Sequence, residues 1–284
     1  MANAYKPSNH VSPSSILFIP LTAALASVVL GYLYVLGVRH IPFIYINIVT
    51  LFAWGAASMA IAKLVIRGTK ARNPFVAGFL GVLGGLVGYY VHWAFWLRSL
   101  DLGFSVGEYL KDPGFMIQLI REINEEGTWG IGKSWRVVNG TPLLIVWIVE
   151  FVLYLWTLIH GVNGPAGEPF DETSGKWFEK RKPKGGAFEL PPSSEELETA
   201  LRNFSNGDFS YFLTAPMNLE PRSESPCFLL TLYTSPDSYE AYATLEMKTP
   251  GGGKNDKMKE TTVVKLEALS KAQADSILAR RDPA

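Results

Sequence analysis

Four long apolar segments constrain this chain more than any other feature of its sequence. A helix needs roughly 20 predominantly apolar residues to cross the hydrocarbon core of a bilayer. Segments of that length run over residues 16–38, 41–66, 75–97 and 142–162. Helices at the surface of soluble proteins seldom stay apolar on all sides for so long. We therefore expect an α-helical polytopic membrane protein, with a four-helix transmembrane bundle over residues 16–162.

The charge distribution also argues against a single soluble globule. The whole chain is balanced, with 26 basic and 26 acidic side chains, yet its first 100 residues contain no acid. After the fourth apolar segment, acidic side chains outnumber basic ones. An acidic tail disfavours nucleic-acid binding, which needs a basic surface. We expect the lipid bilayer, and no nucleic acid, as a partner.

Basic residues in the loops predict the orientation in the membrane. Loop 67–73 carries three of them, and another run follows the fourth segment; its members are Lys180, Arg181, Lys182 and Lys184. Positively charged loops stay in the cytoplasm. We therefore expect residues 1–15 and the tail to be cytoplasmic and loop 98–141 to be outside. Basic residues in loop 98–141 are a mild signal against this orientation. The basic run either touches anionic lipid or only flanks the last span. Short loops and compact segments favour a bacterial inner membrane.

The outer loop, residues 98–141, is too long for a plain turn. Asp112 followed by Pro113 is a good helix start, because the acid caps the first turn and proline suits the first helical position. Apolar residues then recur with helical spacing until Gly127. We expect an amphipathic helix of about three turns that lies on the bundle or in the membrane interface.

Small residues recur at every fourth position in three of the spans, and this spacing lets helix backbones approach closely. They are Ala23, Ser27 and Gly31 in the first span, Ala53, Ala56, Ala57 and Ala60 in the second, and Ala77, Gly81, Gly84, Gly85 and Gly88 in the third. The simplest interpretation is helix packing within one chain. The alternative is an interface between copies in a homo-oligomer.

Polar residues inside the spans are the candidate functional residues. Glu150 lies eight residues into the fourth span, about 12 Å deep at 1.5 Å per residue, where a carboxylate is costly unless it is paired or protonated. His92 and Asn47 fall in the same half of the bilayer, so a cluster of the three is sterically feasible. We weigh three interpretations: a structural hydrogen bond, a proton- or cation-responsive site, and a protonated carboxyl that faces lipid.

The tail divides into a linker over residues 163–192 and a small α+β domain over residues 193–284. Ser193 opens a capping box that predicts a first helix, and Ser270 caps a last one. Between them, strand-like patterns cover residues 208–215, 227–234, 238–248 and 261–269, with Gly251–Lys257 as a hairpin loop.

The tail offers no recognisable chemistry. Cys227 is the single cysteine of the chain, so no thiolate zinc site can form, and no phosphate-binding loop or catalytic triad is present. We expect no cofactor and no metal. The favoured hypothesis is a membrane-anchored interaction or regulatory protein whose cytoplasmic domain binds a partner. The alternative is a small transporter or channel component that uses the Glu150 site, and an intramembrane enzyme is the least favoured hypothesis.

Overall fold

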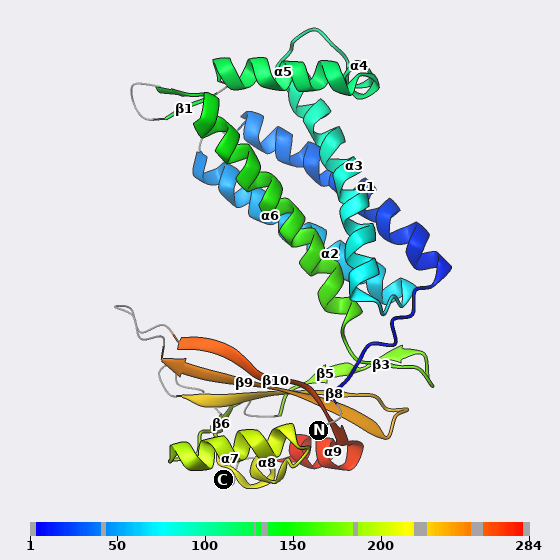
Figure 1. Ribbon diagram of the computed structural model, residues 1–284, viewed down its shortest axis with the longest axis vertical. Coiled ribbons are helices and arrows are strands. Elements are labelled where there is room, and N and C mark those ends of the chain that lie inside the picture. Colours follow the sequence, from blue (N-terminus) through cyan, green and yellow to red (C-terminus); the bar gives the residue numbers. More distant parts are fainter. Residues whose placement is uncertain are drawn as a thin grey trace. The chain divides into compact units, whose positions relative to one another are not determined.

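The structure, a computed structural model, describes residues 4–40, 44–127, 129–131, 136–183, 187–218, 226–250 and 258–280. These residues form two compact units, which are described separately (Figure 1). Residues 8–167 form the helical unit. Residues 4–7 and everything described from residue 168 onward form the α/β unit.

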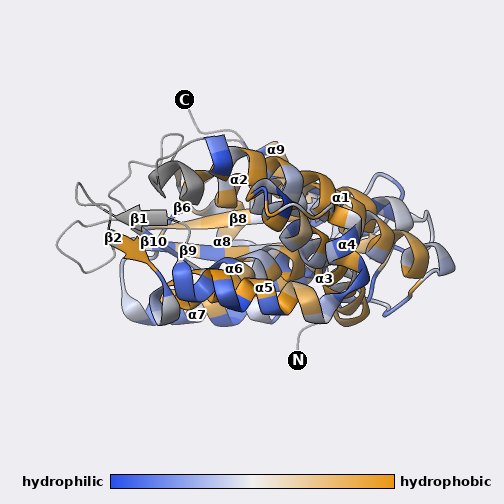
Figure 2. Ribbon diagram, turned by 90° about the horizontal axis from the view of Figure 1, so that it is seen from above, coloured by the Kyte–Doolittle hydropathy of each residue, from blue (hydrophilic) through white to orange (hydrophobic). Residues whose placement is uncertain are grey.

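Four long helices make up most of the helical unit. They are α1 (Pro13–His40), α2 (Ile44–Thr69), α3 (Pro74–Ser99) and α6 (Gly140–Ala166). Within the described part of the chain, these four are the helices long and apolar enough to cross a membrane. Figure 2 shows them mostly in hydrophobic colours.

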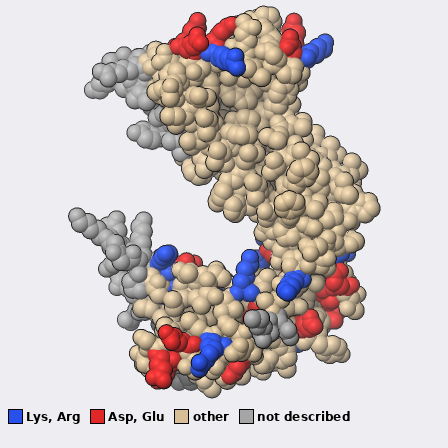
Figure 3. Space-filling view, in the orientation of Figure 1, with Lys and Arg blue, Asp and Glu red and all other residues tan. Residues whose placement is uncertain are grey.

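Large apolar side chains cover the outside of these helices. Phe75 is 83% exposed and Leu64 is 71% exposed, and many other leucines, valines and isoleucines also point outward. On the face shown in Figure 3, the surface of the long helices is almost free of charged side chains. An apolar surface this large is typical of a protein that contacts lipid rather than water.

The four helices pack in a ring. α1 contacts α2 and α3, and α6 contacts the same two helices, so α1 and α6 lie diagonally opposite each other. The close approach of α3 to α1 depends on glycine: a Cβ atom on Gly84 would lie 2.2 Å from the carbonyl oxygen of Pro20, and one on Gly88 would lie 2.1 Å from Cβ of Ser27. The small residues of α3 therefore pack against helices of the same chain.

The connection between α3 and α6 contains two further helices, α4 (Val106–Lys111) and α5 (Pro113–Glu126). Asp112 caps α5 by accepting a hydrogen bond from the Phe115 amide at 2.9 Å, and Gly127 ends it. Met116 and Ile123 are buried in a cluster with Ala94 and Leu97, near the C-terminal end of α3. A short hairpin of β1 (Trp129–Ile131) and β2 (Arg136–Val138) follows.

A six-stranded antiparallel sheet forms the centre of the α/β unit. Its strands are β5 (Glu179–Arg181), β6 (Ala187–Glu189), β7 (Met217–Asn218), β8 (Cys227–Thr234), β9 (Glu240–Pro250) and β10 (Met258–Ser270). The order is β10-β9-β8-β6-β7, and β5 also pairs with β8. A separate two-stranded ribbon joins β3 (Phe170–Asp171) to β4 (Lys176–Trp177).

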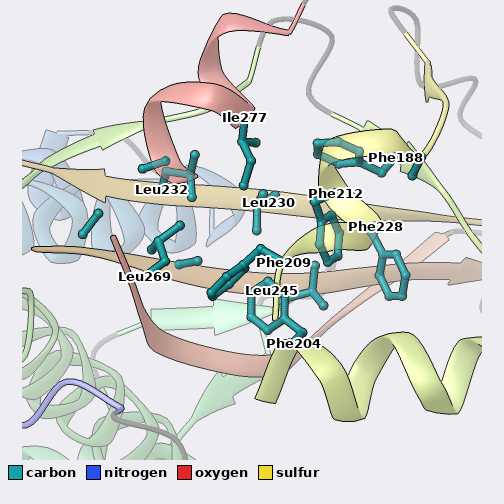
Figure 4. Packing of buried hydrophobic residues seen from close by; sticks show 14 of the residues in the cluster. Phe188, Phe204, Phe209, Phe212, Phe228, Leu230, Leu232, Leu245, Leu269 and Ile277 are labelled. Atoms are coloured by element: carbon teal, nitrogen blue, oxygen red, sulfur yellow. The ribbon is translucent and has the colours of Figure 1, made fainter. Parts of the chain in front are cut away.

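Three helices cover one face of this sheet: α7 (Ser194–Ser205), α8 (Ser210–Thr214) and α9 (Lys271–Ala279). Figure 4 shows Phe204, Phe212 and Ile277 of these helices packed with Phe228 and Leu230 of β8. All five side chains are at most 1% exposed. This cluster is the hydrophobic core that stabilises the unit.

Two features of the tail differ from the sequence-based expectation, and a third expected feature is not tested. The expected linker, residues 163–192, holds the end of α6 and strands β3 to β6, two of which belong to the main sheet. The segment 208–215, expected as a strand, contains helix α8, because Phe209 and Phe212 are both buried in the core when spaced three apart on a helix. The expected hairpin loop Gly251–Lys257 lies outside the described residues, between the paired strands β9 and β10.

Residues 4–7, which we call the N-terminal arm, belong to the α/β unit. The Tyr5 amide donates to the carbonyl of Leu266 in β10 at 2.9 Å, and the Phe170 amide donates to the Tyr5 hydroxyl at 3.2 Å. The Tyr5 ring also meets the ring of Tyr242 edge to face at 5.1 Å. The arm is thus a built-in part of this unit.

Candidate functional site

A cluster of polar and aromatic side chains lies between the four long helices, and we call it the central polar cluster. Its members are Tyr34, Trp54, Tyr89, His92, Glu150 and Tyr154. They come from all four long helices, one from each of α1 and α2 and two from each of α3 and α6. The helices thus bring together side chains that are up to 120 residues apart in sequence (154 − 34).

Glu150 is held by a hydrogen bond across the ring of helices. The Tyr34 hydroxyl donates to Oε1 of Glu150 at 2.8 Å. Because α1 and α6 lie diagonally opposite each other, this bond crosses the centre of the helical unit. Glu150 is half-buried, whereas Tyr34 is buried. The carboxyl group has therefore a defined partner but is not fully enclosed.

His92 occupies the other diagonal of the cluster. Its Nδ1 lies 3.3 Å from the carbonyl oxygen of Gly31, and because a carbonyl oxygen only accepts, Nδ1–H is the donor in this hydrogen bond. Its ring centroid lies 5.1 Å from that of Trp54 and 5.6 Å from that of Tyr34. Gly31 is needed for this approach, since a Cβ atom there would lie 3.1 Å from Cβ of His92.

The structure links two of the three predicted polar residues, Glu150 and His92, through Tyr34, a residue that the sequence analysis did not single out. Glu150 and His92 both contact Tyr34, the first by a hydrogen bond and the second by ring packing. No hydrogen bond joins Glu150 to His92 among the described side chains. The side chain of Asn47 lies outside the described residues.

A second polar contact crosses the same diagonal one or two turns further along. The hydroxyls of Ser27 and Tyr154 form a short hydrogen bond, and the Tyr154 hydroxyl also donates to the carbonyl of Gly85 at 3.0 Å. Ser27 and Gly85 belong to the small-residue rows, so their small size makes room for the tyrosine. This contact ties α1, α3 and α6 together.

The basic run after α6 is partly neutralised inside the α/β unit. Lys180 forms an ion pair with Glu168 at 2.8 Å and lies over the Tyr233 ring at 5.5 Å from its centre. Arg181 pairs with Glu179 at 2.9 Å. Lys182 is exposed, and Lys184 lies outside the described residues. Two of the four charges therefore already have an acidic partner.

A buried acid stabilises the turn between β3 and β4. Asp171 accepts hydrogen bonds from the Ser174 hydroxyl at 2.7 Å and from the amides of Thr173 and Ser174 at 3.0 and 3.4 Å. Burial alone raises the pKa of Asp171, but these hydrogen bonds outweigh it and hold the pKa below its usual value. Asp171 is therefore a structural carboxylate.

The chemistry available in the central polar cluster is proton binding and hydrogen bonding. Across the described ranges, no group of three or more His, Cys, Asp and Glu side chains is placed to hold a metal ion. The cluster contributes one carboxyl, one imidazole and three phenols, and it has no cysteine or serine paired with a base. Comparisons of the chain with protein-family models, with curated proteins and with solved structures found no match.

Proposed function

We propose that this is a membrane-anchored regulatory protein, whose helical unit spans the membrane as a four-helix bundle and whose α/β unit binds a protein partner in the cytoplasm. In this proposal, the protonation state of Glu150 changes how α1 and α6 are held together. The observation that carries it is the bond between Tyr34 and Glu150. It joins the two helices that lead directly into the α/β unit.

The chain connects the two units twice. The N-terminal arm ends at residue 7 and α1 begins at Pro13; α6 ends at Ala166 and the α/β unit resumes at residue 168. Both connections are short, so a change in the spacing or tilt of α1 against α6 alters the positions from which the α/β unit is held. This gives the central polar cluster a covalent route to the partner-binding unit.

Both connections leave the helical unit at the same end, and the proposed orientation follows from the charges at that end. The Arg72 amide donates to the carbonyl of His10 at 3.0 Å, so the basic loop between α2 and α3 lies beside the start of α1. A Cβ atom on Gly167 would lie 3.7 Å from Pro74, which places the end of α6 at the same end. The positive-inside rule assigns this end to the cytoplasm, and we propose a bacterial inner membrane with both termini cytoplasmic.

The energetics favour a responsive contact. Hydrogen bonds between membrane helices contribute about 0.6 kcal/mol on average and at most about 1.7 kcal/mol. A hydrogen bond to an ionised carboxylate is roughly twice as strong as one between neutral groups. Protonation of an ionised Glu150 therefore weakens its hydrogen bond with Tyr34 by about half.

A second candidate function is a small transporter or channel component in which Glu150 takes up and releases a proton or cation. The half-buried state of Glu150 favours it, because a carrier group needs access from outside the cluster. An assembly of several copies of the chain suits this candidate. The regulatory proposal requires the α/β unit, whereas the transporter candidate does not.

The test compares Glu150→Gln with Glu122→Gln, a matched change at an exposed acid of α5. Under the regulatory proposal, hydrogen exchange of the full-length protein in lipid nanodiscs changes with pH at the N-terminal arm and near Leu266, and Glu150→Gln alone removes that change. Native mass spectrometry of the gently extracted protein shows a second polypeptide that is lost when residues 168–284 are deleted.

The transporter candidate predicts a different pattern. Proton or cation flux into proteoliposomes is then lost in Glu150→Gln and persists without residues 168–284. If Glu150→Gln changes neither the hydrogen exchange nor the flux, both proposals fail and Glu150 has only a packing role.

A further inference from the structure

A small, partly open cavity lies in the helical unit beside Ser27. α1 and α2 supply most of its wall, and Gly81, Leu158 and Val162 complete it. The space open to the centre of a water-sized sphere is about 20 Å³. Most of the lining is apolar, but three residues with hydroxyl side chains are among the lining residues, namely Thr22, Ser27 and Ser58.

Ser58 is the unusual member of this lining. Its side chain is 3% exposed, and its hydroxyl has no hydrogen-bond partner in the structure. A buried hydroxyl without a partner is costly in a protein interior, so native structures seldom leave one unsatisfied. The Ser58 hydroxyl therefore has a proton available for whatever occupies the cavity.

The other two hydroxyls have already used their protons. Thr22 donates to backbone carbonyls of its own helix, one of which is Ile19 at 3.2 Å. Ser27 has a single proton, which it donates either to the Ala23 carbonyl at 2.6 Å or to the Tyr154 hydroxyl; the second choice leaves Tyr154 free to donate to Gly85. A hydroxyl has one donor and two acceptor positions, so both groups retain acceptor capacity. The cavity thus offers one free donor and two acceptor groups.

We infer that this cavity binds one water molecule. The water accepts a hydrogen bond from Ser58 and donates to Ser27 and Thr22, which gives it three partners, the usual number for a buried water. The volume fits, since one water needs at least about 10–15 Å³ by this measure. A hydrated cation is too large, and a bare cation finds no carboxylate among the lining residues.

The water completes a hydrogen-bond chain through all four long helices. The chain runs from Ser58 of α2 through the water to Ser27 of α1, from there to Tyr154 of α6, and then to the Gly85 carbonyl of α3. Such a chain holds the helices together at one level of the unit, independently of the Tyr34–Glu150 contact. This inference stands or falls separately from the proposed function.

The direction in which Ser58→Ala shifts the melting temperature tests the inference. If the cavity holds water, Ser58→Ala removes one of the three partners of that water and lowers the melting temperature of the full-length protein in detergent. If the cavity is dry, the same change removes an unsatisfied hydroxyl and raises the melting temperature. Ser15→Ala is the matched control, because that buried hydroxyl already donates to the Thr69 carbonyl at 3.3 Å, and its loss lowers the melting temperature in either case.

A direct measurement uses alanine methyl groups. Ala26 and Ala62 line the cavity, whereas Ala94 is fully buried elsewhere in α3. In methyl-labelled, otherwise deuterated protein, we expect nuclear Overhauser effects from long-lived water to Ala26 and Ala62 and none to Ala94. The absence of these effects at both cavity alanines, or a raised melting temperature of Ser58→Ala, overturns the inference.

Discussion

Replacing Gly84 by alanine tests the packing of α3 against α1. The new Cβ atom would lie 2.2 Å from the carbonyl oxygen of Pro20 and 2.8 Å from Cβ of Ala23. Real Cβ atoms essentially never approach closer than 3.0 Å, so α1 must move away by roughly 0.8 Å (3.0 − 2.2). The obstacle is backbone, which cannot rotate aside as a side chain does.

The expected cost follows from this geometry. Overpacking by one methyl group costs about 1–3 kcal/mol in well-packed interiors, and a backbone obstacle favours the upper end, about 3 kcal/mol. The control is Gly68→Ala in α2, where a Cβ atom meets nothing within 4 Å. That change gains helix propensity, up to about 1 kcal/mol relative to glycine.

The assay is reversible unfolding of the full-length protein in mixed micelles, followed by circular dichroism as the fraction of denaturing detergent rises. We expect Gly84→Ala to be less stable than the unmodified protein and Gly68→Ala to be at least as stable. Equal stability of the two variants would refute the close contact of α3 with α1.

Three further predictions concern the α/β unit. Tyr5→Ala removes the hydrogen bond from Phe170 and the ring contact with Tyr242, so we expect faster amide exchange in β9 and β10; unchanged exchange would contradict a packed arm. Hydrogen bonds hold the pKa of Asp171 below its usual value despite burial. The ionised carboxylate therefore stabilises the fold fully above about pH 4, the approximate pKa of an Asp side chain in an unfolded chain. This stabilisation is lost as pH falls through the lower pKa of the folded state. Amide exchange should therefore accelerate from pH 7 to pH 3 more in the unmodified protein than in Asp171→Asn, after correction for intrinsic rates. Burial raises the pKa of the Cys227 thiol, so maleimide should label it slowly in the native protein and readily after denaturation; equal rates would argue against its burial.

The long helices were readable from the sequence because one physical requirement defines them. A span must be apolar over about 20 residues, and the four segments meet this requirement whichever way they pack. The same apolar character explains why the sequence did not predict Tyr34 as the hydrogen-bond partner of Glu150. α1 is apolar on all sides, so no pattern in it indicates which face points inward, and Tyr34 becomes a partner only once α1 and α6 lie diagonally opposite each other.

The tail shows the same limit in another form. Ser193 and Ser270 mark helix starts through local hydrogen bonds, and α7 and α9 begin directly after them. In segment 208–215, Phe209, Tyr211 and Leu213 alternate as in a strand, but burial of Phe209 with Phe212 favours a helix. The local sequence alone does not decide between a strand and a helix here, because the choice depends on the sheet against which the segment packs.

The N-terminal arm also imposes an order on how the protein is made. Tyr5 leaves the ribosome 261 residues before its partner Leu266 (266 − 5). At about 5–20 residues per second, the arm waits roughly 13–50 s for β10 to be synthesised. Until then, the hydrogen bond between the Tyr5 amide and the Leu266 carbonyl cannot form. β10 follows the other described strands of the sheet along the chain, so the contact of the arm with Leu266 forms only after they have been synthesised.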